Sequence, residues 1–249
     1  MGAAPSHPTL PLLETCRAAL LHLWLNREAW LRLALVPVIL SFALGVTLEA
    51  IDNHDLALFV SVADILPLTL FSVSWHRLML LGPQGAPGGL GADWEARHTR
   101  FLGRTLLLGL GLGLIAVVPA LILVEVMGLI PVIAMPLLGM VVVMLLVATR
   151  LSLVFPAIAI DRDYSFFDSW RDTAGHGFRI VGLILAVQIP FWLALVVLNL
   201  IATDTGLAEA APYTLMLVQE AGNYLAAAGG VAVLALAFRA LGKPTSKLV

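Results

Sequence analysis

The sequence predicts an all-α integral membrane protein with six transmembrane helices arranged as three hairpins, plus amphipathic helices at the cytoplasmic interface. The first observation is composition: 60% of the 249 residues are hydrophobic and 12% are charged, whereas soluble domains have about 45–50% apolar and about 25% charged residues. The second is the presence of six long apolar segments. The third is that every Lys and Arg falls on one side of them. We therefore expect one polytopic membrane domain over residues 1–249.

The N-terminal residues 1–29 are expected to form a cytoplasmic tail and an interfacial helix. This segment is apolar enough to suggest a span, but Glu14 and Arg17 lie within it. A charge at the centre of a span costs about 2.5–3.5 kcal/mol on the insertion scale. We therefore expect a helix that lies in the membrane interface, with Trp24 at the depth of the headgroups.

Six later segments are apolar over about 20 residues, the length that a helix needs to cross the hydrocarbon core. The links between them are alternately short and long, and the two long polar loops are residues 76–104 and 150–179. This alternation predicts three helical hairpins joined by those loops. The expected spans are residues 30–51, 56–75, 105–126, 129–149, 180–201 and 213–238.

The distribution of positive charge orients these spans. All fourteen Lys and Arg residues fall on the side of the termini and the two long loops, whereas the short links carry acids such as Asp52, Asp204 and Glu209. The positive-inside rule therefore places both termini and both long loops in the cytoplasm. Arg outnumbers Lys twelve to two, and Ala, Gly and Leu are abundant. This bias is typical of GC-rich bacterial genes, so we expect a bacterial inner (cytoplasmic) membrane location.

The second long loop contains a short predicted helix. Ser165 and Asp168 have the spacing of a capping box, and Gly175 suits the end of the helix. On a helical wheel Phe166, Phe167 and Trp170 share one face, which predicts a helix lying on the cytoplasmic membrane surface. After Arg150, this loop has four aspartates and three arginines, which disfavours a sensor of anionic lipids. Its polar face then suits a protein partner, or the helix is an elbow that directs the fifth span.

A longer motif in this loop is similar to a motif of a known protein family. It consists of Arg150, Ser152, Leu153, Pro156, Ala157, Ala159, Asp161, Ser165, Ser169, Trp170, Thr173 and Gly175. The motif resembles the segment after the fourth span of YciC-like bacterial inner-membrane proteins. It is also similar to the membrane domain that precedes some glycerophosphodiester phosphodiesterases. The resemblance implies a six-span or similar topology, and it does not carry over phosphodiesterase activity, because no such catalytic domain is recognisable.

Four polar residues are predicted to lie inside the membrane: Asp64, Gln188, Glu220 and Asn223. Ionisable groups at that depth are costly and usually functional. Asp64 lies near the middle of its span, just before Pro67, and no cation is available at its depth. One hypothesis is a pocket that opens outward, where Asp64 and Glu220 bind a cation or exchange a proton. The alternative is that the polar groups bond to one another and fix helix packing.

Small residues predict close contacts between helices. Gly109 and Gly113 form a GxxxG pair on the third span, and Gly229 lies among small residues on the sixth. Such residues allow close backbone approach in lipid, either within one chain or with a neighbour.

No catalytic or phosphate-binding motif appears, and the single cysteine excludes a thiolate metal cage. We therefore expect no enzyme activity, no cofactor and no metal. A net charge of −2 gives no basic field for nucleic acid. The expected partners are membrane lipids and a membrane protein or a second copy.

We expect a structural or accessory component of a membrane assembly or of envelope maintenance, and the alternative is a transporter or lipid-handling protein that uses Asp64 and Glu220.

Overall fold

The computed structural model describes residues 10–51, 53–127 and 130–242, without the side chains of His54 and 118–138. Over these ranges the chain is helical with no strand, which confirms the all-α prediction. The helices are α1 (Leu12–Leu25), α2 (Arg27–Glu49), α3 (His54–Ala63), α4 (Ile65–Leu81), α5 (Ala96–Met127), α6 (Ile130–Leu151), α7 (Val154–Ala159), α8 (Phe166–Asp172), α9 (Gly177–Asp204), α10 (Leu207–Ala210) and α11 (Pro212–Leu241).

Six helical segments of the described chain are long and apolar enough to cross a membrane. They are Arg27–Glu49, Asp55–Leu81, Ala96–Val117, Gly139–Ala159, Gly177–Asp204 and Pro212–Leu241. Each overlaps one predicted span, and together they indicate a multi-pass membrane protein. Asp52, residues 128–129, which include Gly128 of the predicted link 127–128, and the two lysines of the C-terminal tail lie outside the described residues.

The predicted loop 76–104 is shorter in the structure. Helix α4 continues to Leu81 and ends at Gly82, whose φ of +76° suits a glycine after a helix end. Helix α5 begins at Ala96, so that only residues 82–95 connect the two helices. The sequence prediction ended each span at its first polar residues. A helix, however, continues past the apolar region until its backbone hydrogen bonding is interrupted.

The predicted polar loop 150–179 also begins with a buried segment. After α6 ends, the six residues of α7 are all buried. This short helix contacts α4, α5 and α11. Its sequence, VFPAIA, is apolar throughout, so burial among these helices removes its side chains from water. The polar part of the loop therefore lies between α7 and α9 and contains α8.

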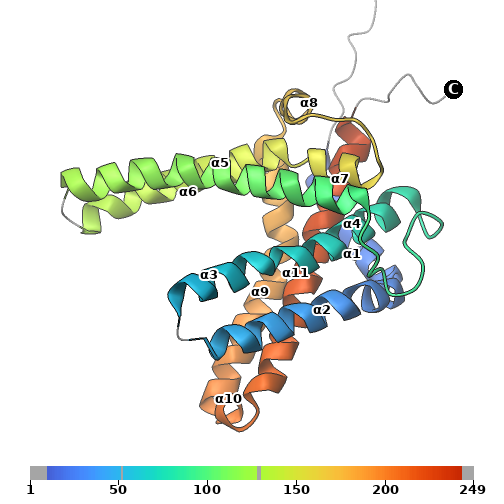
Figure 1. Ribbon diagram of the computed structural model, residues 1–249. Coiled ribbons are helices and arrows are strands. Elements are labelled where there is room, and N and C mark those ends of the chain that lie inside the picture. Colours follow the sequence, from blue (N-terminus) through green and yellow to red (C-terminus); the bar gives the residue numbers. More distant parts are fainter. Residues whose placement is uncertain (1–9, 52, 128–129, 243–249) are drawn as a thin grey trace, which may run out of the picture.

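Helix α11 lies at the centre of the molecule and contacts α1, α2, α4 and α9. The α9 contact is close, because a Cβ atom on Gly229 would lie 2.6 Å from Cγ1 of Val187. On the other side, Trp75 Nε1 donates to the carbonyl of Ala228 at 3.0 Å. Figure 1 shows α9 and α11 side by side, with the α5–α6 pair running away from them. Small residues on α11 thus allow neighbouring helices to pack closely around it.

The glycines of α5 have different surroundings from those of α11. Among the described atoms, none lies within 4 Å of a Cβ placed on Gly109 or Gly113. The close helix contact within one chain that the GxxxG pair suggested is therefore not found there. Helix α5 packs against α6 on other residues, and its glycine pair faces away from the described chain.

We predict that Gly229→Leu destabilises the protein, whereas Gly113→Leu does not. A side chain at 229 has to displace Val187, which is fully buried, and overpacking of this kind costs about 1–3 kcal/mol. Thermal unfolding of the purified protein in detergent, followed by tryptophan fluorescence, measures the effect. A similar fall in Tm for both variants would contradict the packing described here.

Candidate functional site

The four polar residues predicted to lie within the membrane line a single cavity. Asp64 joins α3 to α4, Gln188 is on α9, and Glu220 and Asn223 are on α11. The cavity has a volume of about 250 Å³. Its other lining residues are Leu68, Trp192, Tyr224, Ala226 and Ala227. Three helical segments far apart in the sequence therefore contribute polar groups to one place, with α11 between the other two.

Asp64 lies at an interruption in its span. Helix α3 ends at Ala63 and α4 begins at Ile65, although the Asp64 amide still donates to the Val60 carbonyl at 3.2 Å. The interruption lies just before Pro67, which has no backbone N–H to donate to a carbonyl one turn earlier. The side chain is half-buried, so it is set against α2 and α11 while part of it remains accessible.

Asp64 belongs to a chain of hydrogen bonds that joins three helices. The Ser41 hydroxyl on α2 donates to Asp64 Oδ1 at 2.5 Å, and Ser41 Oγ also lies 2.9 Å from the Tyr224 hydroxyl on α11. The Tyr224 ring is buried and packs edge-on against Phe71. These contacts fix one oxygen of the Asp64 carboxylate next to the cavity.

The opposite wall of the cavity is formed by Gln188 and α11. The Gln188 amide donates to the Ala226 carbonyl at 3.4 Å. A Cβ atom on Gly230 would lie 2.7 Å from Gln188 Nε2, so the glycine leaves room for the amide beside α11. Glu220 is half-buried and Asn223 is exposed. The two polar α11 residues therefore stand at the accessible part of the cavity.

The cavity is lined by two acids and no base. Neither Lys, Arg nor His is among its lining residues. Asp64 lies about 14 Å along the helices from Asp55, and Glu220 lies about 12 Å from Pro212, at 1.5 Å per residue. Both acids are thus well inside the apolar segments. The arrangement can hold a cation or protons, and Trp192 and Tyr224 add aromatic rings that attract cations. Among the described residues, no three His, Cys, Asp or Glu side chains gather as a metal site.

Sequence reasoning missed Ser41, Trp192 and Tyr224 as members of this site. A serine within an apolar helix usually bonds to its own backbone, and single aromatic residues are common in spans. The sequence could have indicated them only by their expected depth in the membrane. Ser41 and Tyr224 lie at positions along their helices comparable with those of Asp64 and Glu220. Their partners, however, depend on how the helices pack.

A second polar cluster joins the two long loops. Asp161, just after α7, makes ion pairs with Arg97 at 2.8 Å, Arg100 at 2.6 Å and Arg77 at 3.6 Å. Asp161 has a φ of +57°, which is uncommon for a residue other than glycine. An acid of the second predicted loop thus binds arginines of the first.

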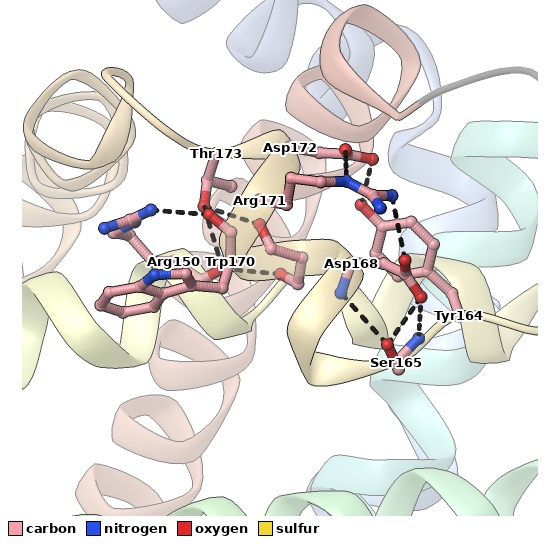
Figure 2. Close-up of polar contacts among 9 residues, drawn as sticks. Arg150, Tyr164, Ser165, Asp168, Trp170, Arg171, Asp172 and Thr173 are labelled. Carbon is pink, nitrogen blue, oxygen red and sulfur yellow. Dashed lines mark hydrogen bonds and ion pairs between the residues drawn. The ribbon is translucent and has the colours of Figure 1, made fainter.

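Figure 2 shows how α8 is attached across the end of α6. The Ser169 and Thr173 hydroxyls donate to the Arg150 carbonyl at 2.6 and 3.1 Å. Ser169 Oγ also accepts from the Leu153 amide at 3.1 Å. Ser169 and Thr173 are fully buried. These are residues of the motif on which the family resemblance rests, and here they fix α8 to the end of α6.

The capping box predicted for α8 is present. The Ser165 hydroxyl and amide donate to Asp168 Oδ2 at 2.6 and 3.0 Å, and the Asp168 amide donates to Ser165 Oγ at 3.1 Å. The hydrogen bonds from the Ser165 hydroxyl and amide lower the pKa of Asp168, because they favour its charged form. Burial, and then the hydrogen bond to Asp172, raise the pKa of the nearby Tyr164 hydroxyl.

The three aromatic side chains of α8 have different surroundings. Phe166 is partly buried with the Arg104 guanidinium 5.2 Å from its ring, and Trp170 lies against Arg150. Phe167 is 72% exposed. Phe167 is therefore the most exposed of the three, Trp170 is also exposed, and the interfacial location of α8 stays a prediction.

Comparisons of the chain with protein-family models, curated proteins and solved structures gave no match.

We predict that Ser165→Ala raises the pKa of Asp168 toward its ordinary value, because the variant loses the hydroxyl that favours the carboxylate. A carboxyl group with a lowered folded pKa adds stability above its unfolded pKa, and this contribution is lost as pH falls through the folded value. Titration of the aspartate side-chain carbon signals by NMR measures the shift. Ser165→Thr keeps a hydroxyl and should retain the low pKa; an unchanged pKa in Ser165→Ala would contradict the capping box.

Proposed function

We propose that this chain is a membrane transport protein that binds a small organic cation in the intramembrane cavity, in exchange for protons. The observation that carries the proposal is the meeting of Asp64 and Glu220 in one cavity that no basic residue lines. Both carboxyl groups can take either protons or an organic cation. This is the alternative that the sequence analysis left open, and the cavity now favours it.

The shape and chemistry of the cavity support a small ligand with an ammonium group. A volume of about 250 Å³ lies below the range of about 300–1,000 Å³ typical of drug-sized ligands. The face of an indole or phenol ring attracts an ammonium group by about 0.5–2 kcal/mol, and Trp192 and Tyr224 lie beside the two acids. The amides of Gln188 and Asn223 offer further oxygen acceptors.

The experiment uses purified protein in liposomes with an acidic interior and a trapped pH-sensitive dye. Tetramethylammonium is the external probe, since it has no proton to lose and cannot leak across as a free base. We expect wild-type protein to raise the internal pH when the probe is added. Asp64→Asn and Glu220→Gln should each slow this response by at least about tenfold, because each removes a charge that faces the cation at low dielectric.

Glu209→Gln is the matched control, because it removes an acid on α10 that does not line the cavity. Trp192→Leu is a second test variant. The Trp192 ring is partly exposed, so its replacement has little effect on the fold. No response of the wild type to the probe, or equal rates in wild type, Asp64→Asn and Glu220→Gln, would refute cation transport.

The second candidate is the accessory role expected from the sequence. It is supported by Gly109 and Gly113, whose small surfaces on α5 face no described part of the chain and suit close docking of another helix. A partner of fixed stoichiometry that co-purifies in mild detergent, together with no cation flux, would favour this role over transport.

We further propose that the protein lies in a bacterial inner membrane as three hairpins, with its termini and long loops in the cytoplasm. Supporting contacts join the arginine-rich ends: Asp161 binds arginines of α4 and α5, and Arg239 of α11 donates to the carbonyl of Leu80 at 3.0 Å. Alkaline phosphatase fused after Ala210 should be active and after Gly242 inactive. The reverse pattern would invert the topology.

We also propose that the chain is a YciC-like protein. It is supported by the motif residues Arg150, Ser169 and Thr173, which form one hydrogen-bonded unit between α6 and α8. A shared role in holding α8 would explain why these residue types recur together.

A further inference from the structure

A second cavity, unrelated to the proposed transport site, lies where α6, α8 and α9 meet. Its volume is about 380 Å³. Its walls are mainly apolar side chains, with Val143, Leu146 and Val147 on α6 and Phe178 on α9. Val143 and Phe178 are largely exposed, so this groove is open along the apolar surface of the molecule. Arg150 and Trp170 line it as well.

Arg150 is held in one position at this groove. Its guanidinium lies 3.5 Å from the centre of the Trp170 ring, and Nη2 donates to the Trp170 carbonyl at 2.6 Å (Figure 2). A Cβ atom on Gly177 would lie 3.1 Å from Arg150 Cγ, so the glycine leaves room for the stem of the arginine. The ring and the glycine together direct the charge to the groove.

The charge of Arg150 is not compensated within the described chain. No carboxylate of the described residues lies within ion-pair distance, and Arg150 Nε is buried with no hydrogen-bond partner among them. The arginines around Asp161 differ, because Arg77, Arg97 and Arg100 all share a carboxylate. A buried donor on a charged group is costly to leave unsatisfied. Arg150 therefore has no anionic partner among the described residues.

We propose that this groove binds one phospholipid with an anionic headgroup, whose phosphate pairs with Arg150 and whose acyl chain lies between α6 and α9. Arg150 follows the last apolar turns of α6, where a helix leaves the hydrocarbon. Guanidinium groups bind phosphate through strong charge-assisted hydrogen bonds, and the apolar walls match an acyl chain. The acidic residues of α8, which argue against a general sensor of lipid charge, do not line this groove.

The test uses the full chain, purified and delipidated in detergent, with native mass spectrometry to count retained lipids. Dioleoyl-phosphatidylglycerol and dioleoyl-phosphatidylcholine are added at equal concentration as probes. We expect wild-type protein to retain one phosphatidylglycerol in preference to phosphatidylcholine. Arg150→Gln should lower the affinity for phosphatidylglycerol about tenfold, as expected for losing one charge-assisted hydrogen bond.

Arg104→Gln is the matched control, since it also removes a guanidinium next to an aromatic ring but outside the groove. A second pair of variants tests the groove even if Arg150→Gln misfolds. Val143→Trp should block the groove, whereas Val142→Trp, at an exposed neighbour outside the groove, should not. The proposal is overturned if the wild type shows no lipid preference, if Arg150→Gln and Arg104→Gln lose lipid equally, or if Val143→Trp retains it. None of these results affects cation transport.

Discussion

The close approach of α9 to α11 is the contact on which the rest of the structure depends. Glycines on α11 allow it, since Cβ atoms at Gly222 and Gly229 would lie 2.5 and 2.6 Å from side chains of α9. In a membrane the solvent of an apolar side chain is lipid, so moving it into a helix contact gives no hydrophobic free energy. Close van der Waals packing is therefore a main source of helix association. Because α11 is narrow here, α2 and α4 can also contact it.

The polar cavity follows from this packing. Helices α4 and α9 both pack against α11, so that Asp64, just before α4, and Gln188, on α9, line one cavity beside it. Gly230 provides the space in which the Gln188 amide rests. The glycines that bring α9 close to α11 therefore lie on the same stretch of α11 as Glu220, Asn223 and the other residues that line the cavity.

Much of the architecture could be predicted because apolar length and charge are local properties. Each of the six apolar segments overlaps a predicted span, and the capping box of Ser165 and Asp168 is present. Asp64 and Glu220 were identifiable because acids in apolar helices are rare. Tertiary contacts were not predictable: the buried α7, the ion pairs of Asp161 and the hydrogen bond from Ser41 all join segments distant in sequence. Polarity alone could not assign them partners.

Helix α4 links the two polar regions of the molecule directly. Asp64 precedes its first residue, and Arg77, near its other end, faces Asp161 and donates to the Ala159 carbonyl. The 17 residues between Ile65 and Leu81 form an unbroken rod of about 26 Å. One continuous helix therefore separates the carboxylate that lines the cavity from the arginine–aspartate cluster at the loops.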